Sequence, residues 1–243
     1  KGPRLISAGH IIVQTGGHSA SVGYEADGVD GVRKAARYHL KRGCEWIKVA
    51  ASGGIANWPI HESPFMLEYG VEELKVAAEE AHKRLRRACA HTYPAQAIKN
   101  CVTAGIDSIE HGCWMDEAAA DMMAEAGTYF VPTMGNFYTS VANSHKAGNR
   151  EQLEFKIREI IEPHRKSVAM AYEKGICIAT GTDTNGNLVD EVVLLHGVGM
   201  KPMEAIQAAT RNAARVLGLE EEVGTLRPGK MADIIVVEEN PLE

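Results

Sequence analysis

Residues 44–54 read CEWIKVAASGG, an apolar run that carries a lysine near its centre and ends in two glycines. Because side chains alternate across a β-strand, Ile47 and Val49 share one face, which predicts packing against helices. Lys48 lies on the opposite, inward face. Burying an unpaired ammonium group costs several kcal/mol, so this lysine must be paired, neutralised or chemically modified.

The stretch by itself leaves two interpretations of Lys48 open. In the first, the lysine lies at the rim of the sheet, where its amine reaches water or pairs with a carboxylate such as Glu110. In the second, the lysine belongs to a functional site that other parts of the chain complete.

The chain around this stretch alternates short apolar runs with helical patterns. Apolar residues three and four apart within residues 27–43 predict a helix, and further helices are predicted between the later apolar runs. The predicted strands are residues 4–13, 46–52, 88–93, 107–112, 128–135 and 175–184. Strict alternation of strand and helix indicates a parallel sheet with right-handed crossovers. A closed (β/α)8 barrel needs about eight such units, so two are missing from this chain.

The end of the chain has a different pattern. Residues 232–238, ADIIVVE, predict one strand between segments rich in Gly and Pro, and no later strand is available to pair with it. We therefore expect residues 1–220 to form a partial barrel domain and residues 221–243 to be part of a small β domain.

Composition limits the function classes. The chain has 243 residues and a formal net charge of −6, which argues against nucleic acid or an anionic membrane as partner. A small-molecule substrate is expected instead, and the sequence permits a homo-oligomer. No apolar run approaches the roughly 20 residues of a membrane helix. Five cysteines without a CxxC pair indicate reduced thiols, which is typical of a cytoplasmic protein.

Side chains of the types that bind metal ions follow three of the predicted strands. His91, His111 and Asp183 each lie at the carboxyl end of a strand, where barrel enzymes place their catalytic groups. Two imidazoles, a carboxylate and Lys48 form a donor set suited to Zn²⁺ or a similar divalent ion. A neutral lysine amine takes up CO₂ to form a carbamate, which presents two anionic oxygens to cations. This hypothesis explains a lysine on the inward face.

Several motifs resemble the amidohydrolase superfamily. They are IKVAASGG at 47–54, AHTYPAQAI at 90–98, GIDSIEHG at 105–112, GTDT at 181–184 and the long closing motif at 203–242. Within the superfamily the chain is similar to the imidazolonepropionase-like and Xaa-Pro dipeptidase-like, or metal-dependent carboxypeptidase-like, branch. The resemblance implies a (β/α)8 TIM barrel of the metal-dependent hydrolase type, with about six of eight units present, plus a remnant of a small β-sandwich domain at the C-terminus.

The same resemblance implies roles for the metal-binding set. Lys48 would be a carboxylated ligand bridging two Zn²⁺ or other divalent ions, and His91 and His111 would bind the second ion. Asp183 would be both a metal ligand and the general acid/base. The implied reaction is hydrolysis of an amide bond in dipeptides or N-acyl amino acids, by attack of a metal-bound hydroxide.

Three further residues are candidates for substrate contact. His18 would polarise the substrate carbonyl, and Tyr93, on the same face of its strand as His91, would contact the carbonyl or a carboxylate. The structural alternatives are a loop histidine for His18 and a packing residue at a helix entry for Tyr93. His61 lies in a long loop after a predicted strand, and its neighbours Trp58 and Phe65 are candidates to line a substrate pocket.

One part of the family pattern is missing. The HxH motif of the family's first strand, which supplies two ligands to the first metal, occurs nowhere in these 243 residues. We therefore expect the chain to be a fragment of a longer protein. Two alternatives to the dipeptide hydrolase stay open: a cyclic amidase of the imidazolonepropionase type, and a non-catalytic remnant that lacks the first metal site.

Overall fold

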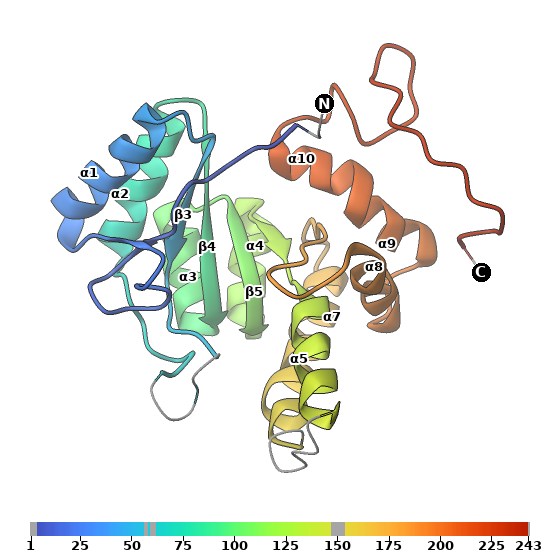
Figure 1. The fold of residues 1–243 in the computed structure, drawn as a ribbon, viewed down its shortest axis with the longest axis horizontal. Helices are drawn as coiled ribbons and strands as arrows, with labels where there is room; N and C mark the ends of the chain where they lie inside the picture. The colour runs from blue at the N-terminus through green and yellow to red at the C-terminus, as the bar shows by residue number, and fades with distance from the viewer. Residues whose placement is uncertain (1–3, 56–57, 59–61, 147–153, 243) are drawn as a thin grey trace. The chain divides into compact units, whose positions relative to one another are not determined.

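The structure of the chain is a computed structural model that describes residues 4–55, 58, 62–146 and 154–242. It divides into two compact units, Lys1–Thr128 and Tyr129–Glu243. Figure 1 shows the helices and strands of both units along the chain.

The first unit is a parallel sheet covered by helices, as the alternating pattern predicts. Its described strands pair in the order β2-β1-β3-β4-β5, and each of these neighbouring pairs is parallel. The five strands form an open row, which agrees with the expectation of fewer than eight units. The strands are β1 (Ile12–Val13), β2 (Tyr24–Glu25), β3 (Trp46–Ala50), β4 (Arg87–Pro94) and β5 (Ser108–Trp114). The helices are α1 (Gly28–Lys41), α2 (Val71–His82), α3 (Ala95–Ala104) and α4 (Glu117–Ala126).

The two faces of β3 differ as alternation predicts. Ile47 and Val49 are fully buried on the face that α1 and α2 cover (Figure 1). In the neighbouring strand β4 they pair with Ala88 and Ala90, which are also fully buried. Lys48 is only half-buried and lies on the opposite face. Alternation thus places Lys48 on the face away from Ile47 and Val49, together with the buried Trp46 and Ala50.

A buried carboxylate ties α1 to α2 in the first unit. The side chain of Glu80, only 6% exposed, accepts hydrogen bonds from Arg33, Arg37 and Lys83 at 2.8–3.0 Å. The hydrogen bond from Arg37 is the largest of the effects that lower the pKa of Glu80, which falls to about 2. An acidic group whose pKa is lower in the folded chain than in the unfolded chain stabilises the fold at pH values above its unfolded-state pKa. This stabilisation is lost as the pH falls through the pKa of the folded state.

We therefore predict that Glu80→Gln lowers the free energy of unfolding by about 2 kcal/mol at pH 7, because three cations lose their shared anion. The difference in free energy of unfolding between wild type and variant should shrink as pH falls from 4.5 toward 2, where Glu80 takes up a proton. Urea unfolding at pH 7 and pH 3 measures both values. Glu79→Gln, an exposed neighbour on α2, is the matched control and should change stability little. Equal losses for both variants would contradict the prediction.

The second unit is mainly helical. Its elements are β6 (Tyr129–Val131), α5 (Met134–Lys146), η1 (Ile157–Ile161), α7 (Glu162–Glu173), α8 (Leu188–Gly197), α9 (Pro202–Gln207), η2 (Ala208–Asn212) and α10 (Ala213–Leu217). The strand predicted at 175–184 is wrong in length, because only Ile178 pairs, in a parallel bridge to Phe130. Neither unit contains, in its described residues, a helix that is long and apolar enough to cross a membrane.

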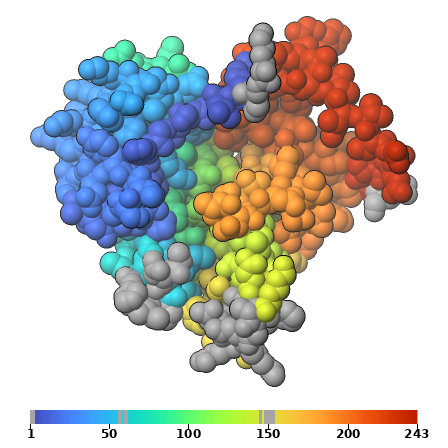
Figure 2. All heavy atoms as spheres, in the orientation of Figure 1, coloured from blue at the N-terminus to red at the C-terminus, as the bar shows by residue number. Residues whose placement is uncertain are grey.

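The C-terminal tail forms no strand in the described chain. Residues 232–238 carry the predicted apolar pattern, yet Ile235 is 88% and Val236 is 93% exposed. The tail, in red, lies at the surface of its unit in Figure 2. A strand forms only where a second strand satisfies its backbone donors and acceptors, and no described residue supplies that partner to this segment. The expected domain division at residue 220 stays a prediction.

Candidate active site

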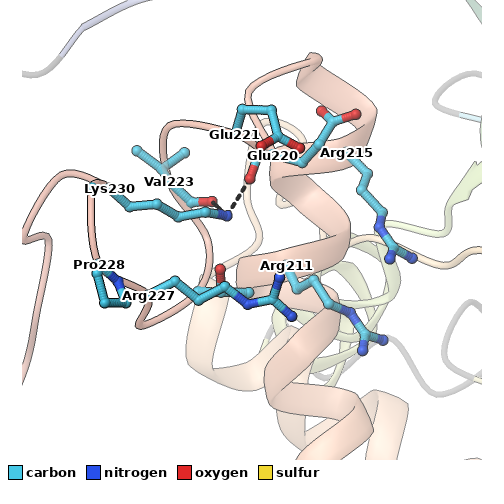
Figure 3. Close-up of a pocket in the computed structure, with 10 residues that line it drawn as sticks. Arg211, Arg215, Glu220, Glu221, Val223, Arg227, Pro228 and Lys230 are labelled. Atoms are coloured by element: carbon cyan, nitrogen blue, oxygen red, sulfur yellow. Dashed lines mark hydrogen bonds between the residues drawn. The ribbon is translucent and has the colours of Figure 1, made fainter.

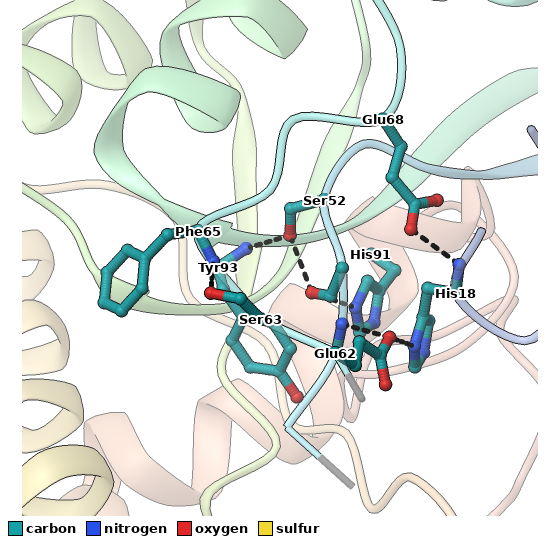
Figure 4. Close-up of polar contacts among 10 residues, drawn as sticks. His18, Ser52, Glu62, Ser63, Phe65, Glu68, His91 and Tyr93 are labelled. Carbon is teal, nitrogen blue, oxygen red and sulfur yellow. Dashed lines mark hydrogen bonds and ion pairs between the residues drawn. The ribbon is translucent and has the colours of Figure 1, made fainter. Parts of the chain in front are cut away.

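Four rings that the sequence analysis selects lie together in the first unit. The rings of His18 and His91 are stacked, with centroids 3.9 Å apart and an interplanar angle of 13°. His111 lies 4.8 Å from His91, and Tyr93 stacks on His111 at 5.1 Å. Figure 4 shows His18, His91 and Tyr93 around this point. The structure therefore brings these four candidates into one cluster, which we call the imidazole cluster.

Two strands and one turn position the cluster. His91 and Tyr93 are two residues apart on β4 and share the face opposite the fully buried Ala90. His18 lies in the turn between β1 and β2, where Gly17 N–H donates to the carbonyl of Gln14. Loops at the ends of parallel strands are where α/β enzymes place their chemistry.

His111 reaches the cluster through an unusual backbone conformation. Its strand partner is Thr92, which faces the helices, so regular alternation would turn His111 away from His91. Instead His111 has φ of +73°, a left-handed value that is uncommon for a residue with a side chain. The ring then lies against His91 and Tyr93. Strained backbone of this kind concentrates at functional sites.

Lys48 lies on β3 near the imidazole cluster. Its strand neighbour is Cys89, and Ala50, two residues along the strand, pairs with His91. Burial lowers the pKa of His91, and the positive charge of Lys48 adds to this lowering. Burial raises the pKa of Cys89 to about 12, and the same charge opposes that rise. Glu110, the alternative partner of the rim interpretation, accepts a hydrogen bond from Ser108 at 2.6 Å, and no ion pair joins it to Lys48 within the described residues.

The remaining predicted site residues are placed differently. Asp183 lies in the second unit, is exposed, and has φ of +49°. One of its carboxylate oxygens accepts a hydrogen bond from Asn136 Nδ2 at 2.9 Å. Its role as a metal ligand and general acid/base stays a prediction. His61 lies outside the residues that the structure describes.

The donor chemistry of the imidazole cluster suits part of a metal site. Burial is the main reason that the pKa of His91 lies well below its usual value, with further lowering by neighbouring His111 and His18. The neutral imidazole that results is the form that binds metal ions. Across the described residues, no three side chains of His, Cys, Asp or Glu are arranged as a ligand set. Two adjacent imidazoles with a nearby lysine therefore fit some, not all, of the ligands of a divalent ion.

Two residues that the sequence analysis missed hold His18. Glu62 Oε1 lies 2.6 Å from His18 Nδ1, and the same oxygen accepts the N–H of Gly54 at 2.5 Å. Glu68 Oε1 accepts the backbone N–H of His18 at 2.6 Å. Burial raises the pKa of Glu68 to about 7, and its Oε2 is buried without a hydrogen bond. The sequence feature that could have indicated Glu62 and Glu68 is the presence of acidic residues in the loop that follows Gly53 and Gly54.

Aromatic side chains adjoin the imidazole cluster. Trp114, at the end of β5, lies 5.9 Å from Tyr93 and 4.7 Å from Phe65, measured between ring centroids. Trp58 lies 6.0 Å from both Phe65 and Trp114. Phe65 is 49% exposed, so part of this aromatic surface faces solvent. Exposed aromatic surface beside polar groups is typical of small-molecule sites.

The second unit contains a separate pocket of about 350 Å³ (Figure 3). Arginine and lysine side chains and two glutamates line much of it: Arg211, Arg215, Arg227, Lys230, Glu220 and Glu221. The Lys230 amine donates to the backbone carbonyls of Glu220 and Val223, so it stabilises the local turn. No imidazole or thiol lines this pocket, and we assign it no role in catalysis.

Comparison with known proteins gives a consistent result. The sequence profile of the amidohydrolase family matches residues 1–243. Ochratoxinase of Aspergillus niger is 34% identical over 271 residues, which cover all of this chain and 56% of the relative. A solved Xaa-Pro dipeptidase with bound methionine superposes with a TM-score of 0.88 at 33% identity, covering all of this chain and 64% of that structure. Imidazolonepropionase of Symbiobacterium thermophilum is 32% identical over 135 residues, 55% of this chain and 28% of that relative. The chain thus spans little more than half the length of the ochratoxinase.

Proposed function

This chain belongs to the amidohydrolase family, and on that premise we propose that it acts as a metal-dependent hydrolase of carbon–nitrogen bonds. We propose dipeptides or N-acyl amino acids as its substrates. The observation that carries this function is the imidazole cluster beside Lys48, at the strand ends of a parallel sheet. The relatives that match the whole chain support an open-chain amide, since they include a Xaa-Pro dipeptidase.

Four residues would hold the metal. Lys48, as a carbamate formed from its amine and CO₂, would provide anionic oxygens, His91 and His111 would provide neutral nitrogens, and Asp183 a carboxylate. Zn²⁺ is the expected ion, and other divalent ions suit the same donors. When bound, the metal supplies Lewis-acid polarisation of the carbonyl and activation of water.

The chain's own residues position the substrate and move protons. Asp183 takes a proton from the attacking water and delivers it to the leaving amine, which is general acid/base catalysis. His18 lies against His91 and contacts the carbonyl oxygen of the scissile amide. Tyr93 stacks on His111 and contacts the carbonyl or the carboxylate of the substrate. Each contact fixes the amide relative to the metal ligands.

The aromatic residues near Tyr93 indicate the chemistry next to the scissile bond. Phe65 and Trp114 present apolar surface beside the imidazole cluster, and Trp58 extends it. Such surface favours an apolar side chain on the substrate over a charged one, because apolar contact area is removed from water.

We predict that the metal-loaded protein hydrolyses dipeptides and N-acyl amino acids, with higher kcat/KM for apolar than for acidic side chains. Release of free amino acid from a panel of such compounds, together with the metal content by elemental analysis, measures this. Turnover of cyclic amides alone would replace this proposal by a cyclic amidase. Less than one equivalent of metal together with no turnover would instead support a non-catalytic remnant.

A cyclic amidase is the second candidate. Its support is the similarity to imidazolonepropionase, which extends over 55% of this chain, whereas the ochratoxinase match extends over all of it. The open-chain substrate is preferred because its relatives match a larger share of this chain. The substrate panel discriminates between them.

A further inference from the structure

We propose that Glu62 is a positioning residue that sets the rotation of the His18 ring, so that Nε2 of His18 faces the substrate. The inference rests on the proposed function of His18, which is to contact the carbonyl oxygen of the substrate. It adds Glu62 as the side chain that holds the His18 ring in the orientation needed for that contact. Glu62 belongs to none of the motifs that carry the family resemblance.

The contact between the two side chains is short and shielded. Glu62 Oε1 and His18 Nδ1 are 2.6 Å apart, while the His18 side chain is 19% and the Glu62 side chain 16% exposed. At this distance the carboxylate oxygen accepts the Nδ1 proton. Partial burial weakens the competition from water, so the hydrogen bond holds the ring more firmly than an exposed one would.

Two contacts together define the orientation of the imidazole. Stacking on His91, with an interplanar angle of 13°, sets the plane of the His18 ring but allows a flip within that plane. The hydrogen bond to Glu62 selects one of the two flipped positions, since only one places Nδ1 at the carboxylate. In the described residues, no hydrogen bond occupies Nε2 of His18. That nitrogen is the one left for the substrate.

Glu62 is itself held in place. The oxygen that binds His18 also accepts the N–H of Gly54 at 2.5 Å (Figure 4). Gly54 follows β3, the strand that carries Lys48. Its hydrogen bond therefore fixes the Glu62 carboxylate at the end of that strand. A Cβ at position 54 would overlap His18 Nδ1 and approach Glu62 Oε1 to 2.9 Å, so the close approach requires glycine. This arrangement is the pattern in which a third group orients a catalytic imidazole.

A matched control is available in the same loop. Glu68 also accepts a hydrogen bond from His18, but from the backbone N–H rather than from the ring. Replacing Glu68 removes a second acidic side chain that binds the same histidine and leaves the ring contact in place. If these acidic residues only held the loop in place, replacing either one would affect the His18 ring alike.

The first arm of the test is spectroscopic. In protein labelled with ¹⁵N in the histidine rings, the Nδ1–H of His18 should give a proton signal protected from exchange by Glu62. Glu62→Ala should lose this signal, Glu62→Gln should keep part of it through its amide oxygen, and Glu68→Gln should retain it. An unchanged signal in Glu62→Ala would overturn the proposal, and amide spectra verify that each variant is folded.

The second arm is kinetic. With metal-loaded protein and its best substrate, Glu62→Ala should lower kcat by about 10- to 100-fold, the range typical of groups that orient catalytic histidines, with KM changed less than about threefold. Glu62→Gln should recover part of kcat. Full activity of Glu62→Ala would also overturn the proposal. If no substrate is turned over, the proposed function fails, while the spectroscopic arm still decides whether Glu62 sets the ring.

Discussion

Replacing Lys48 by methionine is expected to lower kcat/KM for amide hydrolysis by at least about 10³-fold, equivalent to about 4 kcal/mol of lost transition-state stabilisation. The variant cannot form a carbamate, so the proposed metal site would lose one of its ligands and the bound metal content should fall as well. Kinetics on the best dipeptide and elemental analysis of the purified protein measure the two effects.

Stability separates the functional interpretation of Lys48 from the rim interpretation. Lys48 is half-buried, and a methionine of similar length keeps the apolar contacts of its side chain while removing the cost of desolvating a polar group. The free energy of unfolding should therefore stay the same or rise while activity is lost. Lys75→Met, at an exposed position on α2, is the control and should leave kcat/KM unchanged. Unaltered activity and metal content in Lys48→Met would support the rim interpretation.

Replacing Gly53 by alanine is expected to lower the free energy of unfolding by about 3 kcal/mol and kcat/KM by about 10²-fold. A Cβ at this position would overlap the backbone carbonyl oxygen of Ser63, which a side-chain rotation cannot relieve. The segment next to Glu62 must then move. Because Gly53 N–H also donates to the carbonyl of Met66, the same shift strains the loop at a second point. Thermal and urea unfolding with steady-state kinetics test both effects.

Gly31→Ala is the matched control for that variant. Gly31 lies inside α1, and a Cβ there would meet Ala26 at 3.6 Å, an ordinary contact distance. Alanine in a helix interior loses less conformational entropy than glycine, so the control should be stabilised by about 0.5–1 kcal/mol. A loss of stability at position 31 equal to that at position 53 would refute the explanation by overlap with Ser63.

The helices and the long strands agree with local sequence patterns. The helix predicted within 27–43 is α1 at Gly28–Lys41, and the strand predicted at 46–52 is β3 at Trp46–Ala50. Helical periodicity reports contacts within one segment, so it can be recognised without the rest of the chain. A strand, in contrast, forms only where a second strand pairs with its backbone. The segments at 4–13 and 175–184 therefore retain only two paired residues and one bridge, respectively.

Residue type and strand position selected His91 and His111, and the family resemblance added His18 and Tyr93. The structure brings these four rings together. Neither signal indicates which way His111 points. Regular alternation places it on the helix side with Thr92, and the left-handed φ of +73° reverses this. That reversal depends on the neighbouring strand and rings, which no local pattern contains.

The sequence by itself determined the parallel α/β class, the inward face of Lys48 and the chemical types of the site residues, because each depends on alternation or on residue identity. Only the tertiary structure revealed the contact of Glu62 with His18, two residues 44 positions apart. A hydrogen bond of 2.6 Å between two loops depends on how each loop leaves its strand and on the absence of a Cβ at Gly54. These are properties of the folded chain in three dimensions, and no periodicity along the sequence encodes them.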